Sequence, residues 1–428
     1  MLFLERLHLK LILILLAIPF FVSATAGAQV VPAAAGPSNS GEQPLSGTLR
    51  YDLSYSQIAQ FYSGQLGNAL SSAVSGDARY ANSSTSLPFS LTYSGGDIWA
   101  ISGSYGETGV FQHLLVSQGL LRRHWSLNLS DNASYMPQAP ITGFSGIPGV
   151  GSLPDEPSQP SQPILTLRTR SVYNTVSPNF SCTLDRATSL GVNGSYTILR
   201  FPDGNGLETD QWQAGSQLTR RLNVLNSLSS QYAYSHFTYP GYEYSMDTQS
   251  LLFGFTRVWS RRLRTSVSAG PQWIMPSAST EIPSSTDLSV SANAGYSARS
   301  TSVTLNYTQG AMGGAGVSTT VGARNYDASA GVSQQLGKKM SIGATGAYLR
   351  TRGMQQAGSA SGYGGLTNSV YGGVSATRQL SRYFNAYANY TVTHQLSSGA
   401  LPANVISGLS QVIGFGISYS PRELHFRK

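Results

Sequence analysis

Alternation of apolar and polar residues, repeated along most of the chain, restricts how this sequence can fold more than any other feature. In "RYFNAYANYTVTH", residues 382–394, the apolar Phe384, Tyr390 and Val392 alternate with the polar Asn385 and Asn389. Successive side chains of a β-strand point to opposite faces, so this stretch predicts a strand with one apolar and one polar face. The same pattern recurs in "TLRYDLSYS", "DLSVSANAGY", "SVTLNYT" and "QVIGFGISY".

Two kinds of connection separate these alternating segments. Short basic turns begin near Arg220, Arg261, Arg299, Lys338 and Arg382, at spacings of 41, 38, 39 and 44 residues. Between them lie longer polar connections rich in Gly or Pro, such as "FPDGNG", "QGAMGGAG" and "QQAGSASGYGG". Each repeat is therefore a strand, a long connection, a second strand and a short turn, the order typical of a membrane-spanning barrel.

This repeat predicts an all-β fold, a transmembrane antiparallel up-and-down β-barrel of about 18 strands, with 16 as the next best count. Only 11% of the 428 residues are charged, against about 25% in soluble domains. No segment approaches the roughly 18 consecutive apolar residues of a membrane-spanning helix. The soluble alternatives are a β-sandwich, a β-helix or a propeller, but a propeller would place four strands in each repeat.

The N-terminus has the features of a secretory signal peptide. Arg6 and Lys10 precede an apolar run from Leu11 to Val22, and the residues up to Ala28 form a small-residue cleavage site. We therefore expect residues 1–28 to be a signal peptide, 29–45 a flexible leader and 46–428 the barrel. The Pro- and Gly-rich stretch 136–163 is expected to be a long external loop.

The last alternating segment carries a resemblance to a known class. "GFGISY" has Gly414 followed by Ile417 and Tyr419, and in this it resembles the final strand of bacterial outer-membrane β-barrel proteins, although a tail of nine residues follows. The resemblance implies a porin-like protein of the Gram-negative outer membrane. Its partners would be outer-membrane lipid and the insertion machinery, which would recognise the C-terminal strand. The Tyr-, Ser- and Gly-rich strands are also similar to barrels associated with exopolysaccharide export, which implies polysaccharide or secretion-system components as partners.

Charged residues fall into two expected groups. A basic periplasmic rim, near lipid phosphates, is predicted at the short turns and comprises Arg220, Arg221, Arg261, Arg262, Lys338, Lys339 and Arg382. The lumen-facing candidates are Arg50, Asp52, Asp77, Arg79, Arg264, Asp287 and Asp327. Because the second group contains both signs, the formal net charge of +8 does not by itself predict an anion channel.

The expected function is a water-filled channel for passive passage of polar solutes or saccharide, including a conduit for polysaccharide export. A Tyr-rich wet face at Tyr383 and Tyr387 would suit sugar stacking. One alternative is a structural or assembly-partner barrel whose lumen is plugged by residues 136–163. Another is an enzyme at the rim, with His236 or His394 as the base and Ser235 or Asp247 nearby.

Little else in the sequence favours an enzyme. There is no nucleophile elbow, no metal-ligand spacing and no phosphate-binding loop, so neither a cofactor nor a metal is expected. Nucleic-acid binding has no support beyond the basic pI, and the signal peptide argues against it.

Overall fold

The computed structural model describes residues 42–60, 66–82, 84–103, 108–136, 170–204, 208–241, 245–277, 284–312, 322–354, 365–398, 407–421 and 424–427. Every regular element in these ranges is a strand. The strands are β1 Glu42–Gln60, β2 Leu66–Asn82, β3 Phe89–Gly103, β4 Gly109–Leu121, β5 Trp125–Met136, β6 Ser171–Thr183, β7 Thr188–Arg200, β8 Thr209–Arg221, β9 Asn226–Thr238, β10 Ser245–Val258, β11 Leu263–Pro276, β12 Ser285–Ser297, β13 Thr301–Met312, β14 Ala323–Leu336, β15 Met340–Gly353, β16 Leu366–Gln379, β17 Phe384–Ser398, β18 Gly408–Tyr419 and β19 Leu424–Arg427.

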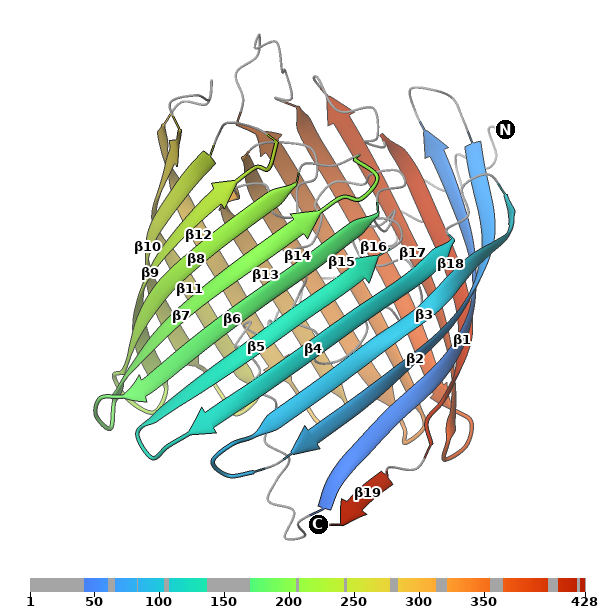
Figure 1. Cartoon of the computed structure of the whole chain (residues 1–428), viewed down its shortest axis with the longest axis horizontal. Helices are drawn as coiled ribbons and strands as arrows, with labels where there is room; N and C mark the ends of the chain where they lie inside the picture. The colour runs from blue at the N-terminus through green and yellow to red at the C-terminus, as the bar shows by residue number, and fades with distance from the viewer. Residues whose placement is uncertain are drawn as a thin grey trace.

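Eighteen of these strands form one closed barrel. Each strand pairs antiparallel with its neighbours in sequence, and β1 closes the ring on β18, with Leu49 opposite Tyr419 and Gln60 opposite Gly408. Figure 1 shows the strands strongly tilted around the ring, as closure of a barrel requires. The prediction of an all-β antiparallel barrel with 18 strands is confirmed.

The two chain ends differ from the expected boundaries. The first strand begins at Glu42, within the stretch expected to be leader, because residues 42–45 pair with the short strand β19. The tail beyond Tyr419 does not simply extend β18, since Pro421 lacks the N–H that a continuous ladder needs. Instead β19 resumes along the same edge of β1, with Leu45 opposite Leu424, and lies beside the start of β1 (Figure 1).

Short turns and long connections lie at opposite ends of the barrel. Residues 122–124, 184–187, 222–225, 259–262, 298–300, 337–339 and 380–383 join strands at the end where β19 lies, while the strand ends that lead into the longer connections are at the other end (Figure 1). The basic turns predicted from sequence therefore share one end. We call these the short-turn end and the long-connection end.

Several short turns are built by one local device. The side chains of Asp185, Asn223, Ser260 and Ser381 each accept hydrogen bonds from the backbone N–H groups two and three residues later in the chain. Asx- and Ser-turns of this kind satisfy backbone donors that the strand ladder leaves open. The polar residue that begins each turn therefore helps to set where one strand ends and the next begins.

Asp185 makes one of these turns sensitive to acid. Its carboxylate accepts from Ala187 N at 2.6 Å and Thr188 N at 2.8 Å, and these hydrogen bonds, with the Ala187 bond the largest cause, lower its pKa below 3.8. The pKa of Asp185 is lower in the folded state than in the unfolded state. The turn's hydrogen bonds therefore stabilise the fold fully above the unfolded-state pKa, and this stabilisation is lost as the pH falls through the folded-state pKa.

We expect an NMR pH titration of the Ala187 and Thr188 amide protons to show a midpoint below 3.8, the ordinary value for this group. Asp185→Asn should abolish the titration. The matched turn at Asn223 supplies an internal control, because its amide acceptor carries no titratable proton. A midpoint at or above the ordinary value would contradict this account of the turn.

The exposed faces of the strands show which side meets the membrane. Large apolar residues are exposed around the barrel, including Leu53, Phe253, Val267, Phe415 and Ile417. The residues that alternate with them, such as Ser266 and Ser268 beside Val267 and Ser418 beside Ile417, point to the inside. Aromatic pairs lie near both ends of this apolar band, with Phe384 and Tyr419 at the short-turn end and Tyr196 and Trp212 near the other. The apolar face is thus the outer one, as in transmembrane barrels.

No helix that could cross a membrane occurs among the described residues.

Candidate functional site

The inner wall is polar along its length but is not equally open along it. On β16, the inward residues Thr367 and Ser369 near the long-connection end are only 1% and 8% exposed, whereas Ser375 and Thr377 toward the short turns are exposed. Neighbouring strands repeat the pattern, with inward Thr351 of β15 buried at 2%. The inward side chains are therefore open at the short-turn end and covered at the other.

Part of this cover comes from the hairpin of β13 and β14, whose end leaves the barrel wall. β12 and β13 pair only as far as Val290 opposite Gln309, although β11–β12 pairing continues to Ser285 and β13–β14 pairing continues to Met312 and Ala323. We call residues 310–311 of β13, Gly322 and residues 323–325 of β14 the inner shelf. Its contacts, described next, place it inside the wall formed by β10, β11 and β12.

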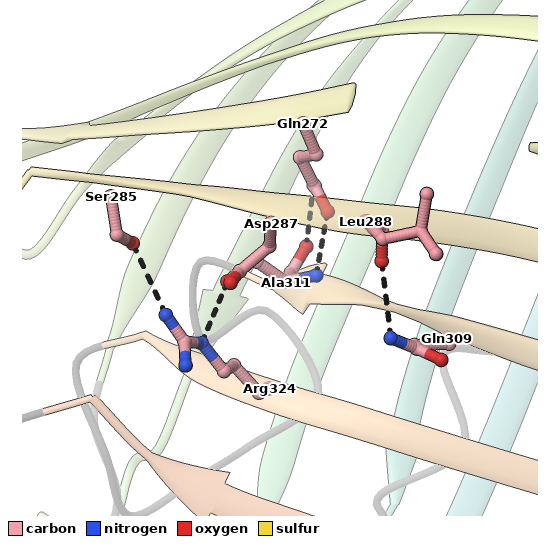
Figure 2. Close-up of polar contacts among 7 residues, drawn as sticks. All are labelled: Gln272, Ser285, Asp287, Leu288, Gln309, Ala311 and Arg324. Carbon is pink, nitrogen blue, oxygen red and sulfur yellow. Dashed lines mark hydrogen bonds and ion pairs between the residues drawn. The ribbon is translucent and has the colours of Figure 1, made fainter. Parts of the chain in front are cut away.

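Polar contacts hold the shelf to the inner wall (Figure 2). The inward side chain of Gln272 on β11 accepts from Ala311 N at 2.7 Å and donates to Ala311 O at 3.0 Å. Arg324 of β14 reaches across to β12, where Nε lies 2.6 Å from Asp287 Oδ2 and Nη2 lies 3.3 Å from Ser285 Oγ. The side chain of Gln309 donates to Leu288 O at 3.3 Å, which occupies an acceptor left open by the broken ladder.

Apolar contacts bury the other side of the shelf. Ala311 packs against a cluster of inward residues on and beside β9, β10 and β11 that comprises Phe237, Tyr239, Met246 and Ile274, with Met354 also in contact. Gly322 approaches this cluster so closely that a Cβ there would lie 3.1 Å from Met246 Sδ, and its φ of +72° is in the left-handed region. Glycine suits this position because it meets both conditions without strain. Apolar packing, as well as hydrogen bonds and an ion pair, therefore holds the inner shelf against the wall.

The structure brings one lumen-facing candidate to the shelf and leaves the others apart from it. Asp287 is inward on β12 and forms the ion pair with Arg324. Asp77 and Arg79 lie on the inner face of β2, where Thr48 donates a hydrogen bond to the Asp77 carboxylate. By alternation with the exposed Val267 and Val332, Arg264 and Asp327 also lie inward. The side chains of Arg50 and Asp52 are outside the described part of the structure, and their backbones pair with Ser418 and Gly416.

The residues predicted to form the basic rim all lie at the short-turn end. Arg220 and Arg221 are the last residues of β8, Arg261, Arg262, Lys338, Lys339 and Arg382 lie in turns, and all of them are exposed. Tyr383 lies in the turn before β17, not on the wet face of that strand, because β17 begins only at Phe384. Tyr387 does lie on the inner face of β17. The Tyr-rich wet face expected for sugar stacking therefore contains one of the two tyrosines on this strand.

The histidines proposed for a rim enzyme face away from the lumen. His236 Nδ1 lies 2.5 Å from Asp247 Oδ1, and Tyr234 donates to the same carboxylate at 3.1 Å. By alternation with the exposed Leu228 and Tyr232 this group is on the outer face, whereas Ser235 points inward. Ser235 and His236 are thus separated by the barrel wall, and the nucleophile–base pair considered from sequence does not form. His394 is on the outer face of β17, opposite Val370.

Among the described residues there is no group of three or more side chains suited to hold a metal ion.

Gln272 and Arg324 were missed by sequence reasoning. Alternation assigns Arg324 to the lipid-facing side together with Tyr326, and a lone Gln gives no signal in a polar strand. The one sequence feature that pointed to the inner shelf is the group of glycines in "QGAMGGAG", which begins at Gly310. Glycine within a strand pattern often marks close approach of another part of the chain.

A closed antiparallel barrel with an apolar outside and a polar inside defines a transmembrane β-barrel of the outer-membrane, porin-like type. No family model and no curated protein matches the sequence.

Among solved structures, the barrel is similar to OccK2 (OpdF) of Pseudomonas aeruginosa, at 11% identity with 88% of this chain and 98% of that chain covered, and a TM-score of 0.47. It is also similar to OccAB4 of Acinetobacter baumannii, at 8% identity over 91% of this chain and 100% of that chain, with a TM-score of 0.46. The outer-membrane protein OpdK of Pseudomonas aeruginosa gives 9% identity over 89% and 99%, with a TM-score of 0.45. At such low identity, the function of this lumen has to be inferred from its own residues.

Proposed function

We propose that this protein is a channel of the Gram-negative outer membrane through which small polar solutes pass passively. The observation that carries the proposal is the inner wall, which is lined by Ser, Thr, Asn and Gln and open at the short-turn end. Uncharged hydroxyl and amide groups replace water around a polar solute without holding it strongly. In the orientation usual for such barrels, the short turns face the periplasm and the long connections face outside.

The inner shelf is the selective part of this channel. It lies where the inward side chains are already covered, and its ion pair between Asp287 and Arg324 presents both charges side by side. With Asp77, Arg79, Arg264 and Asp327 on the rest of the described inner wall, the lumen carries both signs. A solute of either charge then meets an attractive and a repulsive group, so selection acts mainly through size and hydrogen bonding.

Single-channel recording of the purified, refolded protein in planar bilayers tests this function. We expect steady conductance, with a small reversal potential in a salt gradient because charges of opposite sign line the path. A silent bilayer would contradict a channel, provided that heat-modifiable gel mobility shows the barrel to be folded. Conductance that appears only after deletion of residues 136–163, most of which lie outside the described residues, would support the plugged-barrel alternative instead.

A conduit for exported polysaccharide is the finer form of the same proposal. A polymer would have to pass the inner shelf, and the described inner face of β17 offers only Tyr387 as a stacking platform near the short turns. The small-solute form therefore fits the described wall better. Liposome swelling with a mono-, tri- and hexasaccharide series separates the two, because a polysaccharide conduit should admit the hexasaccharide.

A further inference from the structure

Ion pairs between described side chains all lie toward the long-connection end of the barrel. They include Arg170 with Asp203 at 3.7 Å, Arg200 with Asp210 at 2.7 Å, and Arg324 with Asp287 at 2.6 Å. Each pair places a carboxylate beside a cation, so the described charges at this end largely offset one another.

The short-turn end carries positive charge that no described side chain balances. The basic rim is joined there by further exposed arginines of the short turns, namely Arg122, Arg123, Arg186 and Arg299. Asp185 is the one carboxylate within these turns, and it already accepts the hydrogen bonds of its own turn. No ion pair joins the basic rim to another described side chain. The charge of the described barrel is therefore asymmetric along its axis.

Two arginines at the short-turn end point into the lumen. Arg221, the last residue of β8, lies on the opposite face from the exposed, outward Leu218. Arg264, near the start of β11, lies on the opposite face from the exposed, outward Val267. The inward Gln217 of β8 is exposed as well. The guanidinium groups at this mouth therefore border open, water-accessible space.

A charged mouth of this kind acts on ions before they reach the rest of the channel. An opening lined by one sign of charge in a low-dielectric wall focuses the electric field and raises the local concentration of counter-ions. Exposed charges act over about 10 Å at 0.1 M salt but only about 3 Å at 1 M salt. Charges deeper in the lumen occur with both signs, so the mouth is where anions and cations are first distinguished.

We propose that the short-turn mouth collects small anions, so that anionic solutes enter the channel from the periplasmic side faster than neutral or cationic solutes of the same size. This inference rests on the proposed channel function and on the orientation adopted there. The mouth raises the rate of entry from one side, while the solute gradient still sets the direction of net flux. The solutes favoured are small anions that leave the periplasm.

Current rectification by single channels of the full-length protein tests the collector. In bilayers of zwitterionic phosphatidylcholine with symmetric 0.1 M KCl, we expect a larger current when the voltage drives chloride from the short-turn end into the lumen. This polarity carries the anions gathered at the mouth into the channel, whereas the opposite polarity depletes them. The two currents should become equal at 1 M KCl, because the mouth is then screened.

The side of the channel is assigned with the Cys182→Ser/Val224→Cys protein. Val224 is 88% exposed in the turn between β8 and β9, so a membrane-impermeant, negatively charged thiosulfonate reagent reaches it only from the chamber that faces the short turns. We expect the reagent to lower the rectification only from the chamber that supplies chloride at the larger current. Reaction from the opposite chamber would contradict the proposal.

Two variants of equal net charge separate the mouth from total charge. Arg221→Gln/Arg264→Gln removes the inward arginines and should bring the ratio of the two currents toward unity. Arg350→Gln/Arg352→Gln is the matched control, because it removes two exposed arginines of β15 near the long-connection end, and it should leave the rectification unchanged or increased. If the Arg221→Gln/Arg264→Gln barrel does not fold, as judged by heat-modifiable mobility, Lys338→Gln/Lys339→Gln gives the same test at exposed turn positions.

The proposal is overturned if the wild-type currents are equal at 0.1 M KCl, if loss of the mouth charges leaves the rectification intact, or if the control variant abolishes it. Steady but symmetric conductance would mean that the collector alone is wrong. A silent bilayer would instead contradict the channel itself, so the two failures are distinguishable.

Discussion

Phe253→Arg is expected to destabilise the membrane-inserted barrel by about 2–4 kcal/mol, the penalty for an arginine on the lipid face near the bilayer midplane. Phe253 lies near the middle of β10 and is 61% exposed on the outer face. Its replacement places a charge in hydrocarbon, where no water or counter-charge is available. The measurement is reversible denaturant unfolding of the protein in phospholipid vesicles, followed by gel mobility.

Thr256→Arg is the matched control for this prediction, because Thr256 lies toward the short turns and away from the inner shelf. It introduces the same side chain three residues away on the same strand, but on the inner face, where lumen water solvates the guanidinium group. We expect its free energy of unfolding to remain within about 1 kcal/mol of the wild-type value, as for ordinary solvated substitutions. Equal destabilisation by the two variants would show that the assignment of inner and outer faces is wrong.

Release of the inner shelf should have the second large effect. In the Gln272→Ala/Arg324→Ala variant, the shelf loses both hydrogen bonds to Ala311 and the ion pair with Asp287. A hydrogen bond to a charged group contributes about 1.5–3 kcal/mol, which corresponds to about a 10- to 100-fold shift in a two-state equilibrium. We therefore expect channel records in which brief higher-conductance levels become frequent, because the hairpin can leave its seat and re-pair with the open edge of β12.

Arg264→Ala separates this effect from a simple change in lumen charge. Arg264 is an inward arginine on β11, at the short-turn end of the strand and far along it from Gln272. Its loss should alter ion selectivity slightly and leave the records steady. If Arg264→Ala produces the same substates, or if the shelf variant is as steady as the wild type, the shelf does not set the width of the channel.

Much of the barrel follows from local pattern. Strand number, antiparallel order and the separation of short from long connections can all be derived from a two-residue alternation and from turns marked by residues such as Asp185 and Ser260. These features are predictable because each depends on neighbours a few residues apart. The inward or outward side of Asp287 follows from the same alternation once Leu288 is recognised as a lipid-facing residue.

The boundaries at the chain ends were less predictable because they depend on pairing between distant segments. Residues 42–45 carry no clear alternation and contain Pro44, so they look like leader when read alone. They become a strand because the tail at 424–427 lies beside them. Likewise, the tail cannot be placed until the closure of β1 on β18 brings the two termini together.

Sequence alone thus determined the class of fold and the general character of each face, since periodicity is a property of consecutive residues. Only the tertiary structure decided where the inward side chains are covered. Arg324 follows the outward pattern of its strand, yet it meets Asp287 because the β13–β14 hairpin leaves β12 and packs against the inner wall. That arrangement depends on Gln272 and Ile274 of β11 and on Met246 of β10, two and three strands away from β13 around the barrel. Contacts between such distant segments cannot be recognised from the alternation of consecutive residues.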